Sequence, residues 1–215
     1  MKEIFPGVYR RDKKIFTKNL VPGKKVYNEK LVREGGKEYR SWNPYRSKIA
    51  GAILKGLKNF LIKPESRILY LGVANGTTAS HFSDIAKKGI IFGVETSFKP
   101  MKKFVKLCEE RKNMIPILSD ANHPEKYDAI VEEIDLIYQD ISQRNQVEIF
   151  IKNMDKFDVQ HGILMVKARS IDVSSPPKKI FEKVKKEIER YYEINETIKL
   201  SPYAKDHIAI FVEKS

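Results

Sequence analysis

Residues 67–85, RILYLGVANGTTASHFSDI, contain the turn on which the fold depends. An apolar run that favours a strand stops at Gly72, and a short turn with Gly76 leads into an apolar pattern of helical period. We predict a strand, a glycine turn and a helix. The turn lets the backbone approach a ligand closely, and the helix start at Thr77 and Thr78 offers unpaired N–H groups, so a nucleotide-like ligand is the first hypothesis. The Gly-x-x-x-Gly spacing matches neither the dinucleotide motif nor the phosphate loop, and the alternative is a tight turn without a ligand.

An acidic residue ends the next predicted strand, GIIFGVE at residues 89–95. Glu95 lies about 20 residues beyond the glycine turn, where doubly wound folds carry the acid that binds ribose hydroxyls. A carboxylate at this place can accept hydrogen bonds from both hydroxyls. The alternative is an ordinary surface acid ahead of a helix.

Length and charge limit the class of protein. The 215 residues, of which 41% are hydrophobic, suffice for one α/β domain and a small extra unit. The formal net charge of +13 points to a polyanionic partner, nucleic acid before membrane. A solvated basic surface is the alternative.

Cysteine and histidine usage argues against disulfides and metal ligands. The single cysteine, Cys108, cannot form an internal disulfide, which favours a reducing intracellular setting. The four histidines lack ligand spacing, so we expect no metal site. We find no run of about 18 apolar residues and no signal-peptide core, and we expect a soluble protein that is not secreted.

Residues 1 to about 42 predict a small antiparallel sheet, because β-favouring pieces alternate with the turn pairs Pro22-Gly23 and Gly35-Gly36. The pieces are Val8 and Tyr9, Ile15–Thr17, Val26 and Tyr27, Leu31 and Val32, and Tyr39–Trp42. So thin a sheet buries little apolar surface alone, and we expect it to pack on the main domain or on a partner protein. We place the domain boundary between residues 50 and 51.

The rest of the chain alternates helices with strands, which predicts an α/β fold with a mostly parallel sheet of seven strands. The predicted helices, with their inward residues, are one from Asn43-Pro44 (Ile49, Ile53, Leu54, Leu57, Leu61), one from a Ser97 cap (Met101, Phe104, Val105, Cys108), one from Pro124 (Tyr127, Ile130, Val131), one later (Val147, Phe150, Ile151, Met154), and a basic one over residues 176–191. The strands between them are MIPIL (114–118), IDLIYQD (134–140) and GILMVKARS (162–170). The basic helix either touches phosphate or presents a solvated face.

The end of the chain breaks the alternation. The strands YEINETIKL (192–200) and HIAIFVE (207–213) are joined only by SPYAKD, which is too short for a crossover helix. We therefore expect an antiparallel pair at the C-terminal end of the sheet. Such a pair is typical of Rossmann-like methyltransferases and unusual for dinucleotide dehydrogenases.

Six stretches, in order along essentially the whole chain, carry a family resemblance: EYRSWNPYRSKIAGAI (38–53), YLGVANGTTASHFSDI (70–85), SDANHPEKY (119–127), DLIYQDISQRNQ (135–146), KARSID (167–172) and PYAKDHIAI (202–210). They resemble fibrillarin, the S-adenosylmethionine-dependent RNA 2′-O-methyltransferase family of box C/D ribonucleoproteins. The resemblance implies a Rossmann-like methyltransferase fold. The Gly/Arg-rich tail of eukaryotic members is missing, so the chain resembles an archaeal form, for which we expect a cytoplasmic location.

The chain departs from the family at a few positions. Thr96 follows Glu95 where the family commonly has Phe, and the nearest aromatic is Phe98. Further departures are Gln139 and Arg144, where members tend to have Ala and Pro, and Asn75, where Ser is frequent. The acidic positions are intact.

The resemblance implies S-adenosyl-L-methionine as cofactor and assigns its binding to Gly72, Ala74, Thr77, Thr78, Glu95, Thr96, Asp120, Ala121, Asp140 and Gln143. In this assignment Glu95 holds the ribose and Asp120 reads the adenine, while Asp140 lies near the methionine part. The alternative for the two aspartates is helix capping, because Asp often precedes a helix.

The resemblance also implies a catalytic group of Lys48, Asp140, Lys167 and His207. A lysine near the ribose oxygen can stabilise developing negative charge or accept the proton, and Lys167 is the candidate because it ends a strand. The alternatives are a phosphate-binding surface lysine at position 48, with Arg46 nearby, and an ordinary edge residue at His207.

Implied partners are a box C/D guide RNA, the substrate rRNA or tRNA, a Nop-domain scaffold protein and a kink-turn-binding protein of ribosomal type. No membrane partner is implied. Two other functions stay open: a non-catalytic RNA-binding or assembly subunit, and a methyltransferase acting on protein glutamine.

Overall fold

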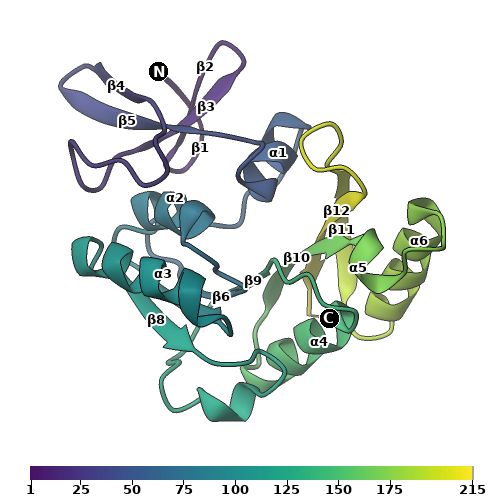
Figure 1. Ribbon diagram of the computed structural model, residues 1–215. Helices are drawn as coiled ribbons and strands as arrows, with labels where there is room; N and C mark the ends of the chain where they lie inside the picture. The colour runs from purple at the N-terminus through teal and green to yellow at the C-terminus, as the bar shows by residue number, and fades with distance from the viewer. Residues whose placement is uncertain (215) are drawn as a thin grey trace.

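The computed structural model describes residues 1–214 and contains two sheets (Figure 1). The first is antiparallel, with strand order β1-β2-β3-β5-β4. Its strands are β1 Lys2–Phe5, β2 Val8–Arg11, β3 Lys14–Lys18, β4 Leu31–Glu34 and β5 Lys37–Trp42. The predicted N-terminal antiparallel sheet is confirmed. The division of the chain at residue 50 stays a prediction.

The second sheet has seven strands in the order β11-β12-β10-β9-β6-β7-β8. They are β6 Arg67–Leu71, β7 Ile90–Glu95, β8 Met114–Leu118, β9 Leu136–Gln139, β10 His161–Lys167, β11 Glu193–Lys199 and β12 His207–Glu213. Strands β6 to β10 pair in parallel, whereas β12 pairs antiparallel with both β10 and β11. The predicted seven-stranded sheet with an antiparallel C-terminal pair is confirmed.

Helices cover both faces of this sheet, which explains why its central strands are apolar throughout. The helices are α1 Lys48–Leu54, α2 Thr77–Ile85, α3 Phe98–Glu110, the 3₁₀ turn η1 Pro124–Lys126, α4 Gln146–Lys156, α5 Ala168–Ile171 and α6 Pro177–Ile188. One buried cluster joins the sheet to α1, α2 and α3, and the other joins it to α4 and α6. Within residues 1–214, every helix is too short or too polar to cross a membrane.

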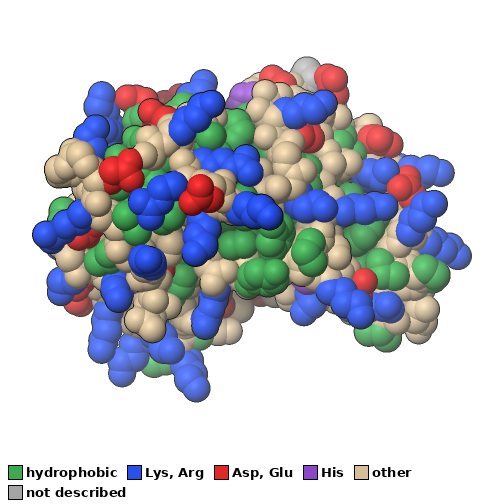
Figure 2. Space-filling view, turned by 90° about the horizontal axis from the view of Figure 1, so that it is seen from above, with side chains coloured by type: hydrophobic (Ala, Val, Ile, Leu, Met, Phe, Trp, Pro, Cys, Tyr) green, Lys and Arg blue, Asp and Glu red, His purple; other side chains and the backbone are tan. Residues whose placement is uncertain are grey.

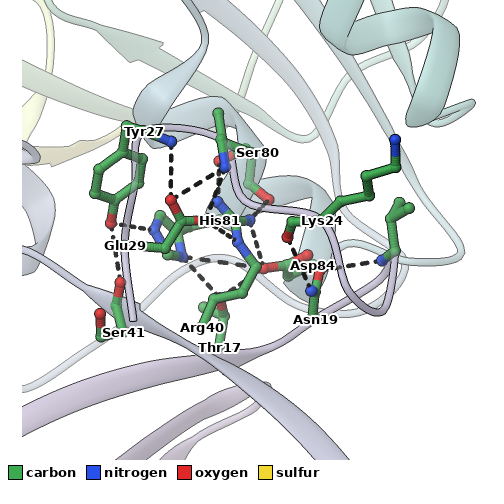
Figure 3. Close-up of polar contacts among 12 residues, drawn as sticks. Thr17, Asn19, Lys24, Tyr27, Glu29, Arg40, Ser41, Ser80, His81 and Asp84 are labelled. Carbon is green, nitrogen blue, oxygen red and sulfur yellow. Dashed lines mark hydrogen bonds and ion pairs between the residues drawn. The ribbon is translucent and has the colours of Figure 1, made fainter. Parts of the chain in front are cut away.

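The first sheet packs on helix α2, as Figure 1 shows, and a buried polar cluster holds the two together (Figure 3). Asp84 of α2 accepts hydrogen bonds from Arg40 Nη1 at 2.9 Å, Arg111 Nη1 at 2.6 Å and Thr17 Oγ1 at 2.6 Å. Arg40 also pairs with Glu29 at 2.6 Å. Two carboxylates thus neutralise two guanidinium groups out of contact with water. Of the two expected packing surfaces for the first sheet, the main domain is therefore the one observed.

Two details of the first sheet differ from prediction. Strand β1 was not expected, and it pairs with β2. The predicted strand at Val26 and Tyr27 is wrong, because the carboxylate of Glu29 accepts both backbone N–H groups, at 3.0 and 2.8 Å. A turn closed by a side chain has taken the place of strand pairing.

The helix predicted from Asn43-Pro44 to Leu61 is shorter than expected. Residues 43–47 form a turn, and α1 begins only at Lys48. The helix ends before Gly56, whose φ of +95° lies in the left-handed region. Leu57 is nevertheless buried, so the apolar spacing reflected burial and not a continuous helix.

The helix predicted from Pro124 is also wrong, since only the single turn η1 forms. Tyr127 and Val131 are buried as expected, whereas Ile130 is exposed. The Tyr127 hydroxyl donates to Asn153 of α4 at 2.5 Å. Packing on α4 and a few turn hydrogen bonds, such as that from the N–H of Ile130 to the Tyr127 carbonyl at 3.0 Å, hold this segment.

Smaller corrections concern α3 and β10. In α3, Val105 is exposed, Cys108 is half-buried, and Met101 and Phe104 are the residues at its buried face. Ser97 occupies the predicted cap position without a capping hydrogen bond from its side chain. Strand β10 stops at Lys167, where the predicted strand ran to residue 170 and the one-turn helix α5 forms instead.

Candidate active site

A cavity of about 270 Å³ lies where the parallel strands β6, β7, β8 and β9 end. Parallel strands bring their carboxyl ends to one edge of a sheet, so residues far apart in sequence meet there. The lining residues are Gly72, Ala74, Val94, Glu95, Thr96, Ser119, Asp120, Ala121, Asp140, Ile141, Ser142 and Gln143. The lining contains three carboxylates and no basic side chain. Such a cavity suits a ligand that carries positive charge.

The turn after β6 shapes the floor of this cavity. Gly72 has a φ of +79°, and a Cβ there would lie 2.6 Å from the backbone oxygen of Asp140. Ala74 also has a positive φ, of 50°, and its N–H donates to Glu95 Oε2 at 3.1 Å. The N–H of Ser97 donates to the other oxygen of Glu95 at 2.8 Å. Two backbone groups therefore fix the orientation of the Glu95 carboxylate.

Asp120 is held in a similar way. The backbone N–H and the side-chain amide of Asn122 both donate to Asp120 Oδ1, each at 2.9 Å. The hydrogen bond from the Asn122 backbone has the largest effect on the pKa of Asp120, and that from the Asn122 side chain comes next. Together they lower this pKa below its usual value. The Asn122 amide also donates to Gln143 Oε1 at 3.1 Å. Asn122 thus connects two residues predicted to bind the cofactor.

A second cavity, of about 320 Å³, adjoins the first and shares Asp140 and Ser142 with it. Its other lining residues are Pro44, Tyr45, Arg46, Ser47, Lys48, Lys167, Tyr203, Ala204 and His207. All four residues predicted to be catalytic therefore line one cavity. Lys48 Nζ donates to Asp140 at 2.7 and 2.9 Å, across 92 positions of sequence.

Lys167 and His207 face each other as a pair across β10 and β12. His207 Nδ1 lies 2.6 Å from the carbonyl oxygen of Lys205, and because a carbonyl only accepts, Nδ1 carries a proton. Burial lowers the pKa of His207, and the charges of Lys48 and Lys167 lower it further. Nε2 is therefore a free acceptor near neutral pH.

Comparison with known proteins identifies the family. The fibrillarin family model matches residues 1–215. The chain belongs to the fibrillarin family. A relative from Thermococcus sibiricus, a fibrillarin-like rRNA/tRNA 2′-O-methyltransferase, is 49% identical over 99% of this chain and 98% of that protein.

Two solved fibrillarin structures are also similar. The fibrillarin of a fibrillarin/Nop5p complex has a TM-score of 0.92 and 45% identity, covering 100% of both chains. Aeropyrum pernix fibrillarin with natively bound S-adenosyl-L-methionine has a TM-score of 0.85 and 43% identity, covering 93% of this chain and 88% of that chain.

The geometry excludes two of the structural alternatives given above for the residues of the site, namely helix capping and a place at the sheet edge. Asp120 and Asp140 are not helix caps, because the cap positions of η1 and α4 are His123 and Asn145. His207 is not at a sheet edge, because β12 lies between β10 and β11. The roles of these residues stay predictions.

The structure places two residues that were expected to bind the cofactor outside the first cavity. Thr77 and Thr78 begin α2 but do not line it, and the Thr78 hydroxyl donates to Ser47 Oγ at 2.9 Å. Phe98 is 70% exposed and is also absent from the lining. In this member of the fibrillarin family, the cavity therefore receives Thr96 where an aromatic residue is common.

Sequence reasoning missed one buried support of the site. Gln146 Oε1 accepts from the N–H of Lys167 at 3.0 Å, and Gln146 Nε2 donates to the Lys167 carbonyl at 3.3 Å. The fully buried glutamine thereby fixes the backbone that carries the lysine. The sequence shows only a polar residue at the start of an amphipathic helix, which does not predict that Gln146 is buried or that it pairs with Lys167.

Basic side chains are spread over the face of the molecule that contains the N-terminal sheet (Figure 2). Lys and Arg are frequent over this face, and the fewer acidic side chains are scattered among them. This distribution agrees with the net charge of +13 and gives a polyanion a favourable approach.

Proposed function

We propose that this chain is the catalytic subunit of a box C/D ribonucleoprotein, and that it methylates ribose 2′-oxygens of rRNA and tRNA with S-adenosyl-L-methionine. One observation carries the proposal: two cavities meet at Asp140, one bordered by carboxylates and the other containing Lys48, Lys167 and His207. Family membership supports it over the full chain.

The donor set of the first cavity fits the cofactor. S-adenosyl-L-methionine supplies an electrophilic methyl group on a positively charged sulfur, and the lining has carboxylates without lysine or arginine. Glu95 would hold the ribose hydroxyls, and Asp120 with the backbone of Ala121 would hold the adenine. Asp140 and Gln143 would lie at the methionine part.

The second cavity supplies the groups that act on the RNA. The Lys48–Asp140 ion pair fixes the carboxylate between the cavities. Lys167 stabilises negative charge that develops on the ribose oxygen as it attacks the methyl group in line. As the new oxygen–carbon bond forms and the sulfur–carbon bond breaks, Nε2 of His207 accepts the hydroxyl proton.

The partners follow from the family. A Nop-domain scaffold protein is the direct partner, and the fibrillarin/Nop5p complex supports it. We extend the proposal to a guide RNA that selects the target nucleotide, a kink-turn-binding protein in the same particle, and a cytoplasmic location. The basic surface supports contact with RNA.

The test measures transfer of labelled methyl from S-adenosyl-L-methionine to a guide-matched RNA, with and without the scaffold, the kink-turn protein and the guide. We expect guide-dependent label on a ribose 2′-oxygen. Label in protein glutamine would replace this function with protein methylation. Cofactor binding without transfer in the complete particle would favour an assembly subunit.

A further inference from the structure

A pair of aromatic residues, the exposed Tyr45 and the half-buried Tyr203, borders the second cavity. The side chains of Tyr45 and Tyr203 both line this cavity, with ring centroids 5.2 Å apart and planes at 75°. Tyr45 is 68% exposed, although an aromatic ring gains free energy when it is covered. Lys48, Lys167 and His207 line the same cavity. The two rings therefore border the place where the reacting hydroxyl has to enter.

The backbone around both rings is well supported. The Asn43 side chain accepts the N–H of Tyr45 at 2.9 Å, and the Asn43 carbonyl accepts the N–H of Arg46 at 3.0 Å. On the other side, a Cβ at Gly51 would lie 3.2 Å from Cβ of Tyr203, so Tyr203 packs directly on the backbone of α1. These contacts fix the backbone that carries Tyr45 and the side chain of Tyr203 before any ligand binds.

Arg46 adds a positive charge beside the rings. It is exposed and lines the same cavity. Lys48 is already paired with Asp140, whereas no carboxylate of residues 1–214 pairs with Arg46. A guanidinium without a partner suits a phosphate oxygen.

We propose that Tyr45, Tyr203 and Arg46 form a subsite for the nucleotide that is methylated. The rings contact the apolar face of its nucleoside, and the guanidinium contacts a neighbouring phosphate. This inference rests on the proposed function, because a ribose hydroxyl that reaches Lys167 leaves the rest of its nucleoside at the cavity rim. Aromatic side chains are the usual platforms for nucleosides in RNA-binding proteins.

The first test measures binding of a guide-matched RNA by the reconstituted particle and the KM of the RNA in methyl transfer. Tyr45→Ala is expected to raise the Kd and the KM of the RNA by about 5- to 100-fold each, the usual range for loss of one stacking contact. Tyr45→Phe should retain wild-type values, and cofactor affinity should be unchanged in both variants. Arg46→Ala should weaken binding and reduce its salt dependence.

The matched control is Tyr191→Ala, because Tyr191 is also an exposed tyrosine, 54% exposed and next to Tyr192, but does not line the cavity. Equal RNA binding by the Tyr45→Ala and Tyr191→Ala particles would overturn the subsite. Binding can be read without turnover, so Tyr45-dependent binding in a particle that does not methylate RNA would refute only the proposed activity.

A second RNA separates the two parts of the nucleoside. It lacks only the base at the target position. If Tyr45→Ala has no effect with this RNA, the ring contacts the base; if the effect persists, the ring contacts the ribose. Both results support the subsite and assign its contact.

Discussion

At the scale of single residues, Asp140 has the central position. It directly follows β9, lines both cavities and accepts two hydrogen bonds from Lys48. Lys167 lies across the second cavity, and no acceptor in residues 1–214 takes a hydrogen bond from its ammonium group. One lysine is thus committed to the carboxylate, while the other remains available to the substrate.

We predict that Lys167→Ala and Asp140→Ala each abolish methylation and leave the protein folded. Loss of one group that stabilises developing charge costs roughly 10²–10³ in rate, and both side chains lie at a cavity, where truncation leaves no void in the core. Single-turnover methyl transfer measures the loss, and circular dichroism checks the fold. Lys152→Ala, in an exposed helical ion pair, is the control and should be fully active. Full activity of either site variant would refute the assignment.

At the scale of elements, helix α2 connects the first sheet to the active site. Its N-terminal turn follows Gly76, in the same glycine turn as Gly72 and Ala74 of the first cavity, and its C-terminal half carries His81 and Asp84 into the buried cluster. The Thr78 hydroxyl also contacts Ser47, directly before Lys48. The placement of Lys48 therefore depends on how α2 packs against the first sheet.

We predict that Asp84→Asn lowers the free energy of unfolding by about 3–5 kcal/mol, because it leaves two buried guanidinium groups without this carboxylate. Urea denaturation followed by tryptophan fluorescence measures the change, since Trp42 is buried beside the cluster. Glu148→Gln removes an exposed carboxylate and should leave the free energy of unfolding nearly unchanged. If the two variants were equally stable, the buried cluster would not be what holds the sheets together.

At the scale of the whole molecule, the joint between the two sheets contains a titratable group. His81 is fully buried, stacks on Trp42 at 4.8 Å, and contacts the hydroxyls of Thr17 and Tyr27, both at 2.7 Å. Burial, with Arg40 and Arg111 nearby, lowers its pKa well below 6.5. The folded protein is therefore more stable with a neutral His81 ring than with a charged one.

We predict that the protein loses stability as the pH falls below about 6.5. In that range the unfolded chain binds a proton at His81 that the folded chain does not, so the free energy of unfolding falls by about 1.4 kcal/mol per pH unit. Above about pH 6.5 His81 is neutral in both the folded and the unfolded chain, so it causes no loss of stability there. Urea unfolding at several pH values measures the slope.

The matched variant for this prediction is His81→Phe, which keeps a ring against Trp42 and removes the titration. Thr17 retains Asp84 as an acceptor, and Tyr27 retains the Ser41 carbonyl. In this variant the free energy of unfolding should fall less steeply with decreasing pH. The slope that remains comes in part from His207, whose pKa is also lowered by burial. An unchanged slope in His81→Phe would contradict this origin.

The order of apolar patterns along the chain predicts the architecture of the main sheet and the edge at which its strands end. Period-2 and period-3.6 patterns are local, and a parallel sheet brings strand ends together whatever their separation in the chain. Glu95 could therefore be placed at this edge from its position at the end of a strand, whereas the places of Asp120 and Asp140 were implied by the family resemblance.

Which polar groups pair with one another depends on how the elements pack in the folded chain. The Lys48–Asp140 contact, the support of Lys167 by Gln146 and the Arg40–Asp84 pair each join residues far apart in sequence. Helix length was also decided there, since apolar spacing reports burial and residues beyond α1 and η1 are buried without being helical. Such pairings depend on how elements pack, and packing free energy is shared among many side chains and is not encoded in any one local pattern.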